Sequence, residues 1–381
     1  MKPILKYIPQ LKDIDPGLLR VICLAVILAI ILAGFWPFNI LPENKVKWLI
    51  NKNGISFYGQ AIVFSSGLLK EKNESLFPDG SISMELRLKP KNKPGDISHI
   101  VDFYDGKLPG VVTVGQWRSH LILLSRTGDP AQFKRGAPYK QRGLSNALVD
   151  NQDVFLTITS DKKGSAVYIN GMQAKAYPGF SLLSEYKDQP FLIVVGNSPT
   201  GQGFWEGELM GLAMYNQVLT PEQIAENYQL WMQENIALLK GNSGLLCLYP
   251  FDEKKGSIIR NHADSGYSLI IPEIFRPVQR IFLEPPWREK KWNLSYLRDV
   301  IINLTGFIPF GFFIVAFLVK KRRFGLNTAC FIVIISGFVF SLSIELTQAY
   351  LPARCSQLSD LILNTFSTAI GVILVHKFVS S

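Results

Sequence analysis

The sequence predicts a mixed fold class, in which an all-β sandwich is inserted between the first and second helices of a four-helix α transmembrane bundle. Three observations predict it. An uninterrupted apolar run lies near the N-terminus, and three largely apolar runs that carry polar residues lie near the C-terminus. The long stretch between them consists of short alternating segments separated by turn residues. The 381 residues are 48% hydrophobic and 18% charged, so the chain is more apolar and less charged than an average soluble protein.

Four segments are apolar over the roughly 20 residues that a membrane-spanning helix requires. The first is longer than a signal-peptide core and lacks a small-x-small cleavage site, so we expect an uncleaved anchor. The expected spans are residues 18–36, 299–319, 327–350 and 358–379. The expected domains are residues 1–40 for the cytoplasmic N-terminus and first helix, 41–290 for the sandwich and 291–381 for the remaining three helices.

Positively charged residues predict the orientation. Lys2, Lys6 and Lys12 precede the first span, and the KKRR run at Lys320–Arg323 occupies the short turn between the second and third spans. Lys and Arg in short loops mark the cytoplasmic side. We therefore expect a multi-pass protein of the inner or plasma membrane, with both termini in the cytoplasm and residues 41–297 outside it.

The net charge of +10 also suits a nucleic-acid partner, but no zinc-finger, basic-helix or RNA-binding pattern supports one. No phosphate-binding glycine loop, Ser-His-Asp pattern or metal-binding box is found, so the sequence predicts no nucleotide or redox cofactor. None of the four cysteines has a metal-binding spacing. A disulfide between Cys247 and Cys355 stays open, because the sequence does not determine their distance.

Residues 41–290 carry strand and turn signals. Runs such as SISMELRLKP, DVFLTITSD and PFLIVVGN alternate with Gly, Pro, Asn and Asp, which is typical of a two-sheet sandwich. The pair Asn170-Gly171 lies between two β-prone runs and predicts a hairpin whose two central residues take positive φ. A helix is expected further along, with Thr220 as its N-cap and Pro221 at its first position.

Two stretches, VYINGMQAK and FLIVVGNSPTGQGFWEGELMGLAMYNQVLTPEQIAENY, resemble the concanavalin A-like, laminin-G-like lectin/glucanase family. The resemblance implies a jelly-roll sandwich, and members of the family often bind sugars, sometimes with calcium. A later stretch, GLLCLYPFDEKKGSIIRNHADSGYSLIIP, is similar to a strand pair usually found near the start of that family. Its late position implies a permuted edge strand and leaves the strand order open.

Sugar binding would use an aromatic face, and calcium binding would use carboxylate oxygens. The glycan-binding candidates are Tyr104, Trp117, Tyr139 and Trp205, for which the alternative is packing in the core or at the rim. Asp102 and Asp105 are the calcium candidates, for which the alternative is an ordinary solvated turn. No pair of carboxylates is placed as a glycosidase requires, so hydrolysis by this domain is not expected.

The stretches RDVIINLTGFIPFGFF and SLSIELTQAYLPARCSQLSDLILNTFSTAIG resemble the VanZ-like family, which is named for an accessory protein of glycopeptide antibiotic resistance. The matching residues are Asp299, Asn303, Phe307, Pro309, Gly311, Glu345, Gln348, Pro352, Arg354, Asp360, Asn364 and Gly371. Two residues depart from the family pattern. Gln357 stands where an acid is common, and Ser367 where glycine is common.

With the predicted orientation, seven polar residues fall at one depth in the outer leaflet: Asp299, Asn303, Glu345, Gln348, Arg354, Asp360 and Asn364. Ionisable groups at membrane depth face partners or a water-filled cavity, which favours a ligand site. The alternative is that Arg354 pairs with Glu345 or Asp360, and Asn303 with Asn364, only to tie helices together. Gly306 and Gly311 are expected to permit close helix packing.

Three functions remain open from the sequence. The first is a non-catalytic envelope protein, whose sandwich binds an extracytoplasmic glycan and whose polar cluster holds a lipid headgroup. The second is an enzyme or transporter-like protein that acts on a lipid-linked or cell-wall precursor, with Glu345 or Asp360 as acid or base. The third is a purely structural membrane protein. The sequence favours a protein without catalytic activity, and its partners would be the bilayer and a glycan or lipid-linked precursor.

Overall fold

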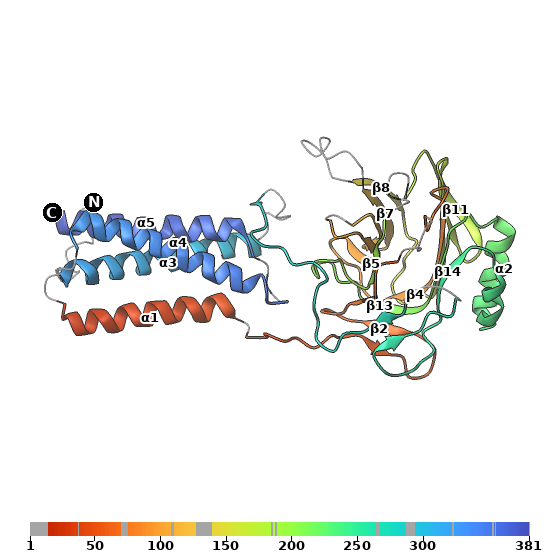
Figure 1. Cartoon of the computed structure of the whole chain (residues 1–381), viewed down its shortest axis with the longest axis horizontal. Helices are drawn as coiled ribbons and strands as arrows, with labels where there is room; N and C mark the ends of the chain where they lie inside the picture. The colour runs from red at the N-terminus through yellow and green to blue at the C-terminus, as the bar shows by residue number, and fades with distance from the viewer. Residues whose placement is uncertain are drawn as a thin grey trace. The chain divides into compact units, whose positions relative to one another are not determined.

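The computed structural model describes residues 14–36, 38–69, 75–107, 110–126, 139–183, 186, 189–263, 267–286, 294–321, 324–352, 354 and 356–380, except for the side chains of 294–296, 298, 299 and 377–380. The chain divides into two compact units (Figure 1). One comprises Met1–Leu41 and Arg280–Ser381, and the other comprises Pro42–Gln279. The first is helical and the second is a β-sandwich that follows the first helix, which confirms the predicted fold class.

Four helices of the first unit are long and apolar enough, by length and composition, to cross a membrane. They are α1 (Pro16–Phe35), α3 (Leu294–Lys320), α4 (Leu326–Gln348) and α5 (Leu358–Ser380). Asp15 caps α1, since its carboxylate accepts the Leu18 N–H at 3.0 Å. α5 packs against α3 and α4, and α1 packs against α3. Their shared apolar cluster includes Ile30, Phe307 and Val333.

Two glycines bring α3 and α5 close together. A Cβ atom on Gly311 would lie 2.2 Å from the carbonyl oxygen of Thr368, and one on Gly371 would lie 2.2 Å from that of Ile308. Helix backbones approach this closely only where the side chain is absent or very small. A Cβ atom on Gly306 would meet no atom of the described residues within 4 Å. The predicted packing role is therefore confirmed for Gly311 and wrong for Gly306.

The sandwich has two sheets of antiparallel strands in the described part of the chain. The first runs in the order β1 (Lys47–Trp48), β2 (Ile55–Phe57), β13 (Gly207–Tyr215), β4 (Ile82–Pro90), β9 (Val154–Ser160), β10 (Gly164–Ile169) and β11 (Met172–Pro178). The second runs in the order β15 (Ile258–Ile259), β16 (Leu269–Ile270), β3 (Val63–Ser65), β12 (Leu192–Val195), β5 (Ser98–Tyr104), β6 (Val112–Trp117), β7 (His120–Arg126) and β8 (Tyr139–Leu144).

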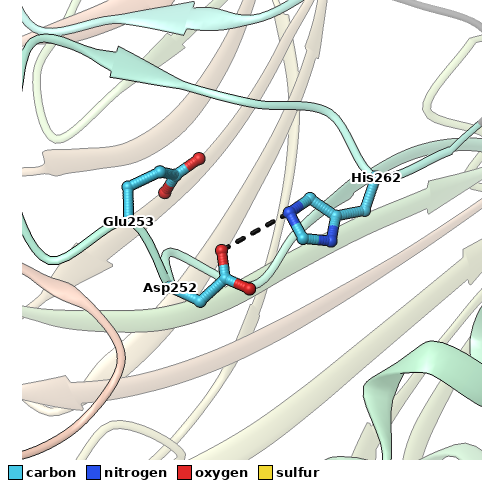
Figure 2. A group of neighbouring side chains, drawn as sticks. All are labelled: Asp252, Glu253 and His262. Atoms are coloured by element: carbon cyan, nitrogen blue, oxygen red, sulfur yellow. Dashed lines mark ion pairs between the residues drawn. The ribbon is translucent and has the colours of Figure 1, made fainter.

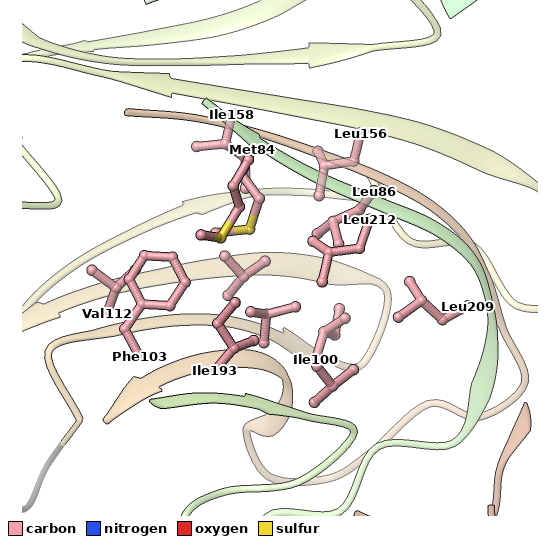
Figure 3. Close-up of a cluster of buried hydrophobic side chains, with 14 of the residues drawn as sticks. Met84, Leu86, Ile100, Phe103, Val112, Leu156, Ile158, Ile193, Leu209 and Leu212 are labelled. Carbon is pink, nitrogen blue, oxygen red and sulfur yellow. The ribbon is translucent and has the colours of Figure 1, made fainter. Parts of the chain in front are cut away.

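The apolar core lies between these two sheets (Figure 3). The first sheet contributes Met84, Leu156 and Leu212, and the second contributes Phe103 and Ile193. Alternate residues of a strand face the same side, so each sheet presents one continuous apolar face to the other. Burial of this surface is the main favourable contribution to the stability of the unit.

The late stretch that resembles the start of the lectin family supplies strands to both sheets. β14 (Leu245–Tyr249) pairs with β13, with Met214 opposite Cys247, and β16 pairs with β3. This arrangement resolves the strand order that the sequence left open. Cys247 is buried with a free thiol, and burial raises the pKa of that thiol to about 12, so it is a poor nucleophile. Cys355 lies outside the described residues.

The predicted hairpin and helix are both found. Asn170 and Gly171 join β10 to β11 with φ values of 50° and 81°, as a tight hairpin turn requires. α2 (Pro221–Met232) begins with a complete capping box between Thr220 and Gln223. It is followed by the short 3₁₀ helix η3 (Ile236–Gly241). α2 packs on the first sheet through an apolar cluster that includes Trp231.

Candidate functional site

Glu345, near the C-terminal end of α4, bonds to residues of the turn that precedes α5. Its side chain is only 2% exposed. One carboxylate oxygen accepts the Gln357 N–H at 2.8 Å, and the Ser356 hydroxyl bonds to the same carboxyl group. Gln357 occupies the position where VanZ-like sequences commonly carry an acid. Gln357 bonds to Glu345 through its backbone N–H, so the replacement of an acidic side chain by an amide at this position does not remove the hydrogen bond.

A short backbone bridge holds the turn that precedes α5. The Glu284 N–H donates to the Ser356 carbonyl oxygen at 2.8 Å, and the Leu358 N–H donates to the Glu284 carbonyl oxygen at 3.0 Å. The Ser356 hydroxyl oxygen also accepts the Leu283 N–H at 3.2 Å. These bonds keep Ser356 and Gln357 in position beside Glu345. The sequence did not predict them, because residues 283–284 carry no strand signal.

Gln348 and Arg354 bind the C-terminal end of α1. The Gln348 amide donates to the Gly34 carbonyl oxygen at 2.7 Å. The Arg354 guanidinium donates to the carbonyl oxygens of Ala33, at 3.4 Å, and Trp36. The last carbonyls of a helix have no partner within the helix, and a cation there also interacts favourably with the helix dipole. The two side chains therefore cap α1, and the Arg354 charge acts on Glu345 as well.

Asn364 ties α5 to α4. Its amide donates to the Ser341 hydroxyl at 3.0 Å, whereas the sequence suggested Asn303 as its partner. Asn303 instead contributes its backbone carbonyl, which accepts the Ser367 hydroxyl at 3.1 Å. Ser367 stands where VanZ-like sequences commonly have glycine, and the hydroxyl gained there links α5 to α3. Asp360 lies half-buried in the first turn of α5, and the side chain of Asp299 lies outside the described residues.

Two buried polar atoms of this region have no hydrogen-bond partner among the described residues. They are the Nε of Arg354 and the Oδ1 of Asn364. A buried polar atom without a partner costs about 1–3 kcal/mol. We define Glu345, Gln348, Arg354, Ser356 and Asn364 as the helical polar cluster. Its unsatisfied donor and acceptor mark the positions where a further polar group would be stabilised.

The four aromatic glycan candidates of the sandwich lie in different environments. Trp205 is fully buried, and its indole N–H donates to the Gln116 side chain at 2.7 Å. Tyr104 is 4% exposed, and its hydroxyl bonds to Gln279. These two rings therefore pack within the fold, as the alternative interpretation holds. Tyr139 is half-buried at the start of β8.

Trp117 is the most exposed of the four, with 37% of its surface accessible. It ends β6 at the tight turn into β7, where Arg118 adopts a φ of 55°. The indole N–H donates to the Gly95 carbonyl oxygen at 3.0 Å, which fixes the ring. The exposed Arg118 guanidinium lies 5.0 Å from the ring centroid, and the His120 ring lies 5.3 Å away on the other side of the turn. We define Trp117, Arg118 and His120 as the Trp117 edge.

Both calcium candidates are bonded to other side chains. Asp102 is fully buried, and its carboxylate bonds to the His99 ring at 2.6 Å and to the Thr113 hydroxyl. Asp105 forms a buried ion pair with Arg126. Burial opposes ionisation of Asp105, but the hydrogen bonds and charge of Arg126 outweigh it and hold the pKa of that carboxyl below its usual range. These contacts favour a structural role for both acids.

Comparisons with known families match two segments of the chain. Residues 244–379 match the family VanZ/LLP1, and residues 65–225 match the concanavalin A-like lectin/glucanases superfamily. Both resemblances inferred from the sequence are thereby confirmed. The first match begins at β14, so it includes the last strands of the sandwich as well as three of the helices. The chain is a membrane protein with a VanZ-like region and a lectin-like region.

Solved structures resemble the chain at low identity. A proposed carbohydrate binding protein from Bacteroides ovatus ATCC 8483 is 14% identical with a TM-score of 0.40, and the match covers 63% of this chain and 62% of that one. The ligand binding domain of botulinum neurotoxin serotype D, in complex with N-acetylneuraminic acid, is 15% identical with a TM-score of 0.37, and the match covers 49% and 45%. The chain thus spans less than two thirds of either structure. No curated protein matches the chain.

Proposed function

We propose that the protein displays its sandwich outside the cell membrane and binds a glycan there through the Trp117 edge. The observation that carries the proposal is the environment of Trp117. It presents a partly exposed ring held in place by a backbone contact, while Trp205 and Tyr104 are buried. An aromatic face that is fixed before binding loses little entropy when a sugar ring stacks on it. The neighbouring Arg118 supplies hydrogen-bond donors for sugar hydroxyl or carboxylate groups.

A glycan array probed with the full chain in lipid nanodiscs tests this proposal. Trp117→Ala should weaken binding about threefold to tenfold, because an aromatic contact contributes about 0.5–1.5 kcal/mol. Tyr58→Ala is the matched control, since Tyr58 is an exposed aromatic residue elsewhere on the sandwich, at 64% exposure. A chain that binds no glycan, or that binds equally well after Trp117→Ala, contradicts the proposal.

The proposed orientation has the short turn after α3 in the cytoplasm, because this turn carries positive charge. Single cysteines at the exposed positions Lys140 and Lys321 would test it in a chain whose own cysteines are replaced. A membrane-impermeant maleimide should label Lys140→Cys in intact cells and label Lys321→Cys only after permeabilisation. The reverse labelling pattern would show that the orientation is inverted and that the sandwich does not lie on the outer surface.

The helical polar cluster supports a second proposed role, the binding of a lipid headgroup. The supporting observation is that two buried atoms, Arg354 Nε and Asn364 Oδ1, have no hydrogen-bond partner among the described residues. The first could donate a hydrogen bond to a polar group of the lipid, and the second could accept one. Glu345 is less suited to proton transfer, because its carboxyl group is already held by Gln357 and Ser356. Native mass spectrometry of gently purified protein should detect a retained lipid that Asn364→Ala loses. Equal retention by both proteins would exclude this role.

A further inference from the structure

We propose that Asp252, Glu253 and His262 form a binding site for a divalent transition-metal ion of the zinc class. Asp252 and Glu253 lie in the connection that leaves β14, and His262 follows β15. Within the described residues, each offers one ligand atom, and these atoms all lie within 4.8 Å of one another. Figure 2 shows the three side chains close together, with the imidazole turned toward the Asp252 carboxyl group.

The distance between the first two ligand atoms suits an intervening ion. Asp252 Oδ1 lies 3.4 Å from His262 Nε2. A direct charge-assisted hydrogen bond is usually shorter, at about 2.7–2.9 Å. Two ligand atoms that each lie about 2.0–2.1 Å from a tetrahedral zinc ion are separated by about 3.3 Å. The observed spacing is therefore closer to that of two zinc ligands than to that of a strong ion pair.

Glu253 provides an independent observation. Its Oε1 accepts the Arg260 N–H at 2.5 Å, which fixes the carboxyl group. Its Oε2 is buried and has no hydrogen-bond partner in the described part of the chain. A buried carboxylate oxygen without a partner is costly. A cation bound beside it would remove that cost.

The scaffold around the three residues is already ordered for binding. Phe251, which precedes Asp252, is fully buried in the core between the sheets. The His262 N–H donates to the Leu248 carbonyl oxygen at 2.8 Å, and the Asn261 side chain accepts the Leu248 N–H at 2.8 Å. Small side-chain movements would therefore be enough to close the site. The side chains of Asp252 and His262 are 41% and 27% exposed, which leaves room for the ion to enter and for water to complete its coordination.

The donor set indicates the class of ion. One imidazole nitrogen with two carboxylates suits zinc and its neighbours in the first transition row, whereas calcium and magnesium prefer oxygen ligands alone. The ion would join the connection that leaves β14, in the first sheet, to the segment that follows β15, in the second sheet. It would therefore act as a cross-link between the two sheets.

A zinc titration of the full, tag-free chain in detergent micelles tests the proposal after treatment with a chelator. Isothermal titration calorimetry should find about one ion bound per chain, and the ion should raise the thermal unfolding temperature, because a ligand that binds only the folded state stabilises it. Asp252→Asn and His262→Gln should each weaken zinc binding at least about tenfold, because each removes one ligand. Calcium at the same concentration should not raise the unfolding temperature.

A matched control is available in the same unit. Glu226→Gln removes an exposed acid from α2. This variant should bind zinc as the unaltered chain does. Cobalt(II) bound to the unaltered chain should give the visible absorption of a four- or five-coordinate ion, a readout that does not depend on whether any variant folds. Zinc binding that is unchanged in Asp252→Asn and His262→Gln, or a six-coordinate cobalt spectrum, would overturn the proposal.

Discussion

The buried carboxylates of the sandwich and the polar side chains at the end of α1 have different partners. In the sandwich, buried carboxylates such as Glu85 and Asp102 bond to other side chains. Glu85, for example, accepts from the side chains of Asn227, Tyr215 and Trp231 at 2.8–3.1 Å. In the helical unit the polar side chains bond largely to the backbone, as Gln348 and Arg354 do at the end of α1. The difference reflects what each fold leaves unpaired, because a sheet interior satisfies its own backbone and a helix end does not.

This contrast indicates which polar groups are available to a ligand. In the sandwich, Glu85 and the Asp105–Arg126 pair are saturated by protein partners, and burial raises the pKa of Glu85. In the helical unit, Arg354 Nε and Asn364 Oδ1 remain without partners among the described residues. Substitutions of Glu85, Asp105 or Arg126 should therefore act mainly on stability. The effect of a substitution in the helical polar cluster on stability should depend on which lipids surround the protein.

The largest expected effect is that of breaking the ion pair between Asp105 and Arg126, whose side chains are 5% and 6% exposed. Arg126→Met leaves a buried carboxylate without its partner, which should lower the free energy of unfolding by about 3–5 kcal/mol. Chemical denaturation of the chain in micelles measures this loss. Arg118→Met is the control, because Arg118 is exposed and should change stability little. A loss no larger than that of the control would show that the pair is not a main source of stability.

The same pair predicts a pH dependence. Arg126 holds the pKa of Asp105 below its usual range in the folded state. The stability due to the pair is therefore present above the unfolded pKa of about 3.9 and is lost as the pH falls through the folded value. The difference in stability between the unaltered chain and Arg126→Met should be largest at neutral pH and should shrink as the pH falls, because the unpaired buried carboxyl of the variant is protonated at a higher pH than the paired carboxyl of the unaltered chain. A difference that stays constant from pH 7 to pH 3 would contradict this assignment.

An intermediate effect is expected at the crossing of α3 and α5. Gly371→Ala would place a Cβ atom 2.2 Å from the Ile308 carbonyl oxygen, and overpacking of this kind costs about 1–3 kcal/mol. Gly306→Ala adds the same methyl group to α3, where no atom in the described part of the chain lies within 4 Å, and alanine is the better helix former by about 1 kcal/mol. Thermal unfolding in micelles should therefore show opposite shifts. Destabilisation of equal size in both variants would exclude close packing as the role of Gly371.

Local signals predicted much of the fold. The Asn170-Gly171 turn and the Thr220 cap depend on residues adjacent in sequence, so their geometry follows from a few side chains. The partners of the polar residues depended on contacts between distant segments. Ser341 was not predicted as the partner of Asn364, because nothing in a single helix reveals which face meets its neighbour. Asp252, Glu253 and His262 form no recognised metal spacing, since the fold rather than the spacing brings them together.

The smallest expected effect concerns Asn364, and it separates the two roles of the helical polar cluster. Ser341→Ala removes the acceptor at 3.0 Å from the Asn364 amide and should cost about 0.6 kcal/mol, the average for such contacts between membrane helices. Ser336→Ala is its control, since that hydroxyl bonds only to the Ile332 carbonyl of its own helix in the described structure, at 2.8 Å.

Asn364→Ala removes the unpartnered Oδ1 as well as the amide that bonds to Ser341. If the cluster only ties helices together, Asn364→Ala should cost the same in lipid-free detergent and in nanodiscs of native lipid. If a lipid headgroup bonds to Oδ1, the cost should be larger in native lipid, because only there is a ligand lost together with the helix contact.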